Sequence, residues 1–197
     1  MALAIGIKIV PVVVVPILVV FGWRRGRRCL ARFVAGFGAT FLLTWMPALW
    51  SHWAQVRSNV LGYQGIGQRQ WGFVQLASWV HAGWLGDFLY GSGRFLVVIG
   101  CAAMPAVVVW WRPRLVVEAV GLSLTAFMFF SPAFATPYLV WAVAAAFLLN
   151  FRWATAYNLT AGVLLIEVYT RWSGGLPWRH ATGNSLTRHE AMFAVAP

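Results

Sequence analysis

Charge is scarce in this sequence, and acidic charge is the scarcest. Of 197 residues only four are Asp or Glu and 10% are charged, whereas 61% are hydrophobic and the mean hydropathy is +0.73. In an ordinary soluble domain about a quarter of the residues are charged. So few charges cannot cover a water-facing surface, which excludes a soluble globular enzyme and a disordered chain. The composition indicates a multi-pass membrane protein, because only lipid accommodates this much exposed apolar surface.

Cysteine, histidine and lysine are also rare. The only cysteines, Cys29 and Cys101, lie in different segments, so no disulfide scaffold is expected. The four histidines have no metal-ligand spacing, and we predict no metal and no cofactor. The net charge of +11 would suggest nucleic acid in a soluble chain. Here the cations, all arginines except Lys8, flank apolar runs and indicate membrane topology, so no nucleic-acid partner is predicted.

Apolar runs divide the chain into membrane spans, several of them near the lower length limit. The charge-free stretch 119–151 would be about 50 Å long as one helix, so we divide it at Pro132 and Pro137. The predicted fold is an all-α polytopic membrane bundle with a polar C-terminal tail at 173–197. Its transmembrane domain, 1–172, has six spans, near residues 3–23, 33–50, 95–111, 115–130, 137–151 and 153–172.

The largest cluster of cations sets the predicted orientation of these spans. Five arginines lie between Arg24 and Arg32, and short loops rich in arginine stay in the cytoplasm. The loop between the first two spans is therefore predicted to be cytoplasmic. The loop 51–93 and the C-terminus are then outside.

One outer segment has the pattern of a helix that lies in the membrane surface. Between residues 72 and 90, apolar residues such as Phe73, Leu76 and Val80 recur at helical spacing with polar residues among them. This pattern predicts an interfacial amphipathic helix. The alternative is a seventh span, which would move the later arginines outside.

The outer loop also has the richest set of polar side chains. Tyr63, Gln64, Arg69 and Trp71 combine amide, aromatic and guanidinium groups, which suit sugar hydroxyls, sugar rings and phosphate. The same residues would fit a connecting loop whose aromatic side chains anchor in the interface. Lys8, inside the first span, either pairs with an anion such as a lipid phosphate or extends to the outer interface.

Four groups of short strings, in order and over nearly the whole chain, resemble integral-membrane GT-C glycosyltransferases. GIKIVP at 6–11, followed by Pro16 and the arginine cluster, resembles the family's helix with lysine, two prolines and arginines. NVLGY at 59–63, together with Trp71 and Gly72, resembles the next outer loop of the family. SPAF at 131–134 and YLVW at 138–141 resemble one further element of the family. Before the tyrosine of this element, the family has glutamine and this chain has Pro137. VYTRWSGG at 168–175 resembles a C-terminal motif.

This resemblance implies a hexosyltransferase of the bacterial cytoplasmic membrane, similar to the actinobacterial mannosyltransferase-like group. Such enzymes transfer a sugar from a polyprenyl-phosphate donor to an acceptor on the outer face. By resemblance, Lys8 would neutralise the lipid phosphate, whose charge persists on the leaving group. Four residues of the outer loop would line the sugar or acceptor side: Tyr63, Gln64, Arg69 and Trp71. Tyr138 and Trp141 would pack at the rim of the outer cavity.

The acidic pair of that family is missing from this chain. Inverting transfer needs a base to deprotonate the acceptor hydroxyl, and the only acidic residue predicted on the outer loop is Asp87. The resemblance covers the C-terminal half of such enzymes, so we predict a fragment or split part whose partner is an N-terminal half encoded upstream. The alternative is a non-catalytic multi-pass subunit or scaffold. A transporter is less favoured, because no paired broken helices and no carboxylate–histidine relay are seen.

Overall fold

The computed structural model describes residue 1 and residues 10–58, 72–131 and 139–172. Every regular element in these ranges is a helix, which confirms the predicted all-α class. In chain order the elements are η1 (Val10–Val14), α2 (Val15–Arg25), α3 (Arg27–Ser51), α4 (Trp53–Val56), α5 (Gly72–Trp79), α6 (Gly83–Phe88), η3 (Leu89–Gly93), α7 (Arg94–Trp111), η4 (Pro113–Leu115), α8 (Val116–Phe130), α9 (Leu139–Phe147) and α10 (Phe151–Trp172).

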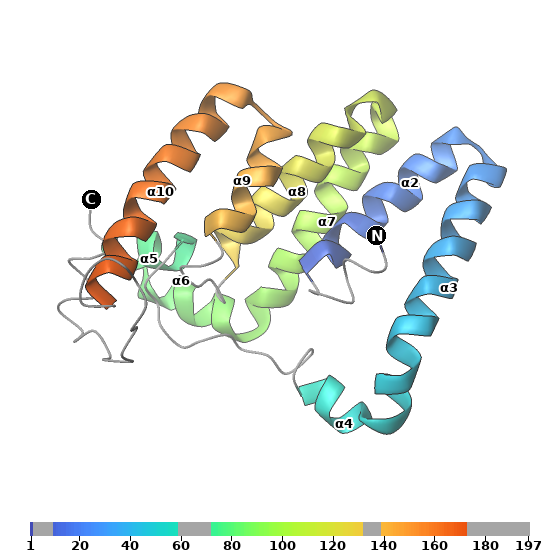
Figure 1. Cartoon of the computed structure of the whole chain (residues 1–197), viewed down its shortest axis with the longest axis horizontal. Coiled ribbons are helices and arrows are strands. Elements are labelled where there is room, and N and C mark those ends of the chain that lie inside the picture. Colours follow the sequence, from blue (N-terminus) through green and yellow to red (C-terminus); the bar gives the residue numbers. More distant parts are fainter. Residues whose placement is uncertain (2–9, 59–71, 132–138, 173–197) are drawn as a thin grey trace.

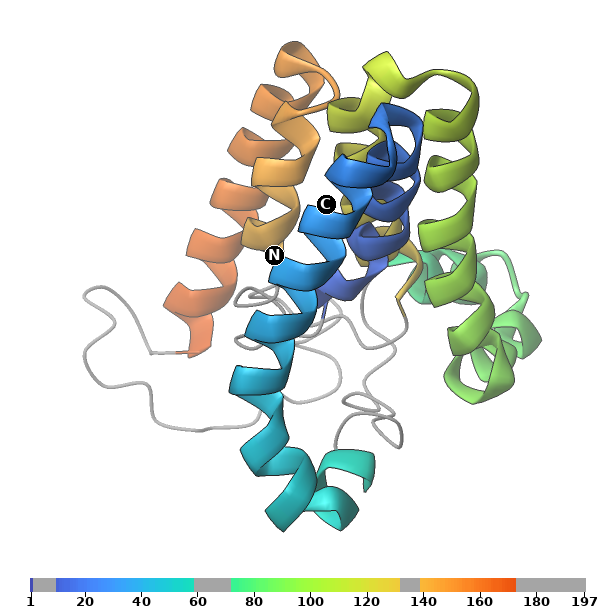
Figure 2. The same cartoon turned by 90° about the vertical axis from the view of Figure 1, so that its right-hand side faces the viewer.

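The long helices run up and down, and three tight turns join them at one end, which is uppermost in Figure 1. These turns connect α2 to α3, α7 to α8, and α9 to α10. The short helices α4, α5 and α6 lie at the opposite end, as Figures 1 and 2 both show. We call the end with the three turns the arginine end, because each turn has at least one arginine in it or beside it.

Each of the three turns has a local cause in the sequence. Gly26 adopts φ 118° and ψ 157°, a conformation open to glycine, and so reverses the chain between α2 and α3. Pro113 restricts the preceding residue to an extended conformation, which ends α7 at Trp111. The side-chain oxygen of Asn150 accepts hydrogen bonds from the backbone N–H groups of Arg152 and Trp153, at 3.0 and 3.2 Å, and caps the start of α10.

The core lies where α2, α7 and α8 meet. Ile17 and Val109 are fully buried there and pack with Ala106 and Ala119. A second cluster joins α8, α9 and α10 through Met128. The small residues of these clusters, Ala106, Ala119 and Ala142, let the helices approach closely.

Helix α3 stands apart from this core. It has no buried residue, and it packs on α2 beside the Gly26 turn and on α4 at its other end. Figure 1 shows α3 diverging from α2 with increasing distance from the turn. Its apolar side chains therefore have few protein neighbours along most of its length.

Several predicted boundaries differ from the observed ones. The second helix begins at Arg27 rather than at residue 33, because arginines and the small residues among them are compatible with a helix. The fifth helix, predicted at 137–151, is described from Leu139 to Phe147, and a turn capped by Asn150 follows. The predicted interfacial helix at 72–90 is divided into α5 and α6 by a break in which His81 has φ 59°.

Three helical stretches are long and apolar enough to cross a membrane, namely Arg27–Ser51, Gly83–Trp111 and Pro113–Phe130. The second includes a change of direction at Gly91, whose backbone is not helical. These stretches are compatible with a membrane protein. Helix α9 is too short by itself, and α10 is long enough but less apolar, because Arg152, Asn158 and Glu167 lie in it. The number of six spans stays a prediction.

Candidate functional site

Most of the residues predicted to form a site lie outside the described part of the chain. Helix α9 includes Trp141, whose side chain is not described. Asp87 is described, exposed, and lies in α6. The predicted site residues that fall outside the described ranges are Lys8, Tyr63, Gln64, Arg69, Trp71 and Tyr138.

The described residues next to these segments share one position in the fold. Val10 begins η1, Ser58 follows α4, Gly72 begins α5, and Ser131 and Leu139 bracket the connection between α8 and α9. All of these helix ends lie toward the end of the molecule opposite the three tight turns (Figure 1). The described helix ends that flank the segments with predicted site residues therefore lie opposite the arginine end.

The described carboxylates are dispersed over the fold. Asp87 lies in α6, Glu118 in the first turn of α8, and Glu167 in α10. Glu118 lies near the arginine end, whereas Asp87 lies at the opposite end, with α5 and α6 (Figure 1). Within the described ranges, no group of three His, Cys, Asp or Glu side chains could hold a metal ion. The described acids thus offer single carboxylates and no pair for general acid–base chemistry.

Four aromatic rings form a ladder along one face of α3. Phe33, Phe37, Phe41 and Trp45 follow each other at every fourth residue, and consecutive ring centroids lie 5.8, 5.9 and 5.8 Å apart. Neighbouring rings are inclined by 15° to 24°, so they are stacked. We call these four residues the aromatic ladder. They were not among the predicted site residues, although their spacing of four is visible in the sequence.

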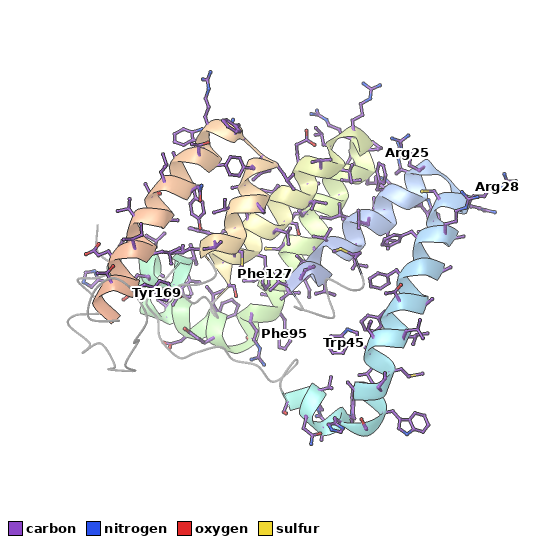
Figure 3. The ribbon with its side chains drawn as sticks, viewed as in Figure 1. Arg25, Arg28, Trp45, Phe95, Phe127 and Tyr169 are labelled. Carbon is purple, nitrogen blue, oxygen red and sulfur yellow. The ribbon has the colours of Figure 1, made fainter. Side chains whose placement is uncertain are left out.

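The aromatic ladder faces the rest of the molecule. Its four residues are half-buried, whereas Leu43 and Trp50, on other faces of α3, are 79% and 87% exposed. Figure 3 shows Trp45 projecting from α3 toward the other helices. The indole N–H of Trp45 is covered and has no hydrogen-bond acceptor. The ladder therefore presents a continuous ring surface on the side where α3 diverges from the core.

The arginine end carries the densest charge in the described structure. Arg24 lies over the ring of Trp110 at 5.8 Å and so connects the ends of α2 and α7. Arg25 lies over Phe21 at 5.1 Å, while Arg28 extends outward, as Figure 3 shows. Cys29, beside these arginines, is exposed. This end is suited to contact anionic phosphate groups at a membrane surface.

No family model, curated protein or solved structure matches this chain. The resemblance to GT-C glycosyltransferases therefore stays a prediction based on the short strings given above.

Proposed function

We propose that this chain is a six-span protein of a bacterial cytoplasmic membrane, with the arginine end in the cytoplasm. The direction of the described helices supports this arrangement, because all three tight turns lie at one end (Figure 1). Three of the six spans would be the long apolar stretches given above. The other three would be η1 together with α2, then α9, and then α10. Eight of the fourteen arginines lie at the three turns, and the described arginines toward the other end are Arg57, Arg94 and Arg171. Arg69, Arg179 and Arg188 also belong to segments that this arrangement puts outside, so the excess at the turns is eight to six and has the sign of the positive-inside rule.

The helices α5 and α6 have the role of an interfacial segment in this arrangement. Helix α5 contains eight residues and α6 six, which correspond to about 12 and 9 Å. The non-helical backbone at Gly91 separates α6 from α7, so neither short helix is long enough by itself to cross a bilayer. Val74 and Ala77 are buried on one side of α5, whereas Trp79 is more than half exposed. An amphipathic pair of helices at the outer surface is favoured over a seventh span.

In this membrane frame, the chain would bind a polyprenyl-phosphate sugar as the donor half of a GT-C-like glycosyltransferase. The observation that carries this proposal is the aromatic ladder on a helix with no buried residue. The stacked rings would offer an isoprenoid chain a flat apolar surface about 18 Å long, since the ladder spans twelve residues.

The chemistry follows from the donor. Transfer breaks the bond between the sugar C1 and a phosphate oxygen, and the acceptor oxygen forms the new bond to C1 while its proton passes to a base. The polyprenyl phosphate leaves with its negative charge, which Lys8 would neutralise. Tyr63, Gln64, Arg69 and Trp71 would contact the sugar or acceptor, with Tyr138 and Trp141 at the rim of the outer cavity.

The base is the open part of this proposal. Asp87 is the acidic residue of α6, toward the outer end, and is the candidate within this chain. The other source is an N-terminal half encoded upstream, whose outer loop would supply a carboxylate. A transfer assay on membranes, with radiolabelled polyprenyl-phosphate sugars, separates these sources. Transfer by this chain alone that is lost in Asp87→Asn would assign the base to Asp87, whereas transfer only with the upstream half would assign it there.

Photolabelling tests the donor-binding step without the need for a base. A photoreactive polyprenyl phosphate is activated in membranes that contain the full chain, and its incorporation into the protein is measured. Phe41→Ala removes a ladder ring and is expected to lower incorporation about two- to tenfold. Leu43→Ala, on the exposed opposite side of α3, is the matched control and should leave incorporation unchanged. Equal incorporation in both variants would contradict donor binding at the ladder.

A non-catalytic membrane subunit is the second candidate function. It is favoured by the dispersion of the described carboxylates over α6, α8 and α10, which offers no acid–base pair. In that case α3 would contact lipid or a partner helix, and no sugar transfer would occur with or without an upstream half. Unchanged photolabelling in Lys8→Ala and Phe41→Ala would favour this second candidate.

A further inference from the structure

One stripe on α10 combines three exposed residues, Asn158, Leu159 and Ile166, with two half-buried ones, Thr155 and Gly162. Its residues recur at intervals of three and four, so they share one face of the helix. We call them the α10 stripe: Thr155, Asn158, Leu159, Gly162 and Ile166. Leu159 and Ile166 are 66% and 53% exposed.

The α10 stripe is separate from the face that packs on the rest of the molecule. Ala154, Ala161 and Val168 are buried on that inner face, and the hydroxyl of Tyr157 donates a hydrogen bond to the backbone oxygen of Leu139 in α9, at 3.0 Å. Helix α10 lies at the edge of the layer of helices, at the far left of Figure 1, with α9 as its main neighbour. The stripe is therefore open to other molecules.

Asn158 is the feature of the stripe that calls for a partner. Thr155 and Thr160 satisfy their hydroxyls within the helix, by donating to the backbone oxygens of Phe151 and Ala156 at 2.9 and 3.0 Å. The carboxamide of Asn158 is exposed and has no hydrogen-bond partner among the described residues. Its position is about 10 Å along the helix from Phe151 and about 21 Å from Trp172, too deep for this short side chain to reach either surface.

Gly162 provides room for close approach beside Asn158. A Cβ atom at Gly162 would have no atom within 4 Å outside its own helix. At Gly121, in α8, a Cβ would lie 2.9 Å from the backbone oxygen of Ala145 in α9, so that glycine is already covered by α9. An open glycine one turn from an unsatisfied carboxamide is the arrangement that lets two membrane helices approach and exchange hydrogen bonds.

We propose that the α10 stripe is the interface of a homodimer in the membrane, in which the Asn158 carboxamides of two copies hydrogen-bond to each other. The inference rests on the six-span arrangement proposed above, which puts α10 across the bilayer. In such a dimer the side-chain N–H of each Asn158 donates a hydrogen bond to the side-chain oxygen of the other Asn158, so two hydrogen bonds join the two copies. Gly162 of each copy permits the approach, and Leu159 and Ile166 pack around the polar pair.

A second copy fits this stripe because a carboxamide is self-complementary. It has both donors and an acceptor, so two identical groups satisfy each other. Two copies inserted in the same orientation have parallel α10 helices, and a two-fold axis along the membrane normal brings each residue near its own equivalent at the same depth. Arg152 lies two turns away at the helix end, where headgroup phosphates would separate the two cations.

Cysteine crosslinking in membranes tests this interface. In the full chain with Cys29 and Cys101 replaced by alanine, Thr155→Cys should form an oxidised dimer of twice the chain mass, because it lies on the stripe. Thr160→Cys, on the opposite face of α10, is the matched control and should stay monomeric. Added to Thr155→Cys, Asn158→Leu or Gly162→Leu should lower dimer formation about three- to thirtyfold, whereas Asn158→Gln and Thr160→Leu should leave it unchanged.

Reagent access separates failure of the dimer from failure of the six-span arrangement. In the same membranes, Leu159→Cys, which lies on the stripe about 12 Å along the helix from Phe151, should be protected from a water-soluble maleimide. If it is modified, α10 does not cross the bilayer and the interface falls together with the arrangement. If it is protected but the chain stays monomeric, or crosslinks only to a protein of another mass, the six-span arrangement stands and self-association is overturned.

Discussion

Gly26 shows how a single residue sets the geometry of the arginine end. Its φ of 118° lies in a region that side-chain-bearing residues rarely adopt, and its backbone N–H donates to the oxygens of Gly22 and Trp23 at 3.1 Å each. The reversal that it makes brings the first residues of α3 beside the last residues of α2. The clustering of five arginines at one end thus depends on this one backbone conformation.

Replacing Gly26 with alanine is therefore expected to destabilise the fold by about 1–3 kcal/mol, through backbone strain rather than a clash, since nothing lies within 4 Å of its Cβ position. The measurement is the unfolding free energy of the purified chain in detergent micelles. Gly36→Ala, in the exposed helical part of α3, is the control and should be neutral or stabilising by up to about 1 kcal/mol. Equal effects at the two glycines would refute the strain argument.

The close contact of α8 and α9 depends on Gly121. A Cβ there would lie 2.8 Å from the Cβ of Leu148 and 2.9 Å from the backbone oxygen of Ala145, so neither neighbour can yield without moving α9. Gly121→Ala is expected to lower the unfolding free energy by about 1–3 kcal/mol. Gly100→Ala in α7, where a Cβ meets nothing within 4 Å, should not destabilise the chain. Thermal unfolding in micelles measures both, and an unaffected Gly121→Ala would mean that α8 and α9 pack differently.

Long apolar runs bounded by arginine or proline were the elements that the sequence predicted well. The third span, predicted at 95–111, corresponds to α7 at Arg94–Trp111, and the fourth, at 115–130, corresponds to α8 at Val116–Phe130. Arginines and prolines at both ends of these runs restrict where a helix starts and stops. The segment 72–90 was predicted less well, because helical spacing alone does not show a break such as that at His81.

The candidate site could be predicted only in part. The aromatic ladder was visible as four rings at every fourth residue, but the same spacing fits a buried core face. Its separation from the core depends on the divergence of α3, which is a property of the whole fold. The same is true of Asn158, whose exposed surroundings follow from the position of α10 at the edge of the bundle, where α9 is its main neighbour.

At the scale of the whole molecule, the arginine end should determine the orientation in the membrane. Replacing Arg24, Arg25, Arg27 and Arg28 with alanine removes half of the cations at the three turns and is expected to give a mixture of orientations. The exposed thiol of Cys29 reports on this mixture, because part of the population would become accessible from outside intact cells. Arg57→Ala, toward the other end, should leave a single orientation. A single orientation in the fourfold variant would show that other features fix the topology.

The most direct test of the account is the side of the membrane on which each end of the bundle lies. In the full chain with Cys101 replaced by alanine, Cys29 should resist a membrane-impermeant maleimide in intact cells and react after permeabilisation. With Cys29 also replaced by alanine, Ser92→Cys, exposed in η3 at the opposite end, should react in intact cells. Modification of Cys29 in intact cells, or protection of Ser92→Cys until permeabilisation, would contradict the six-span arrangement with its arginine end in the cytoplasm.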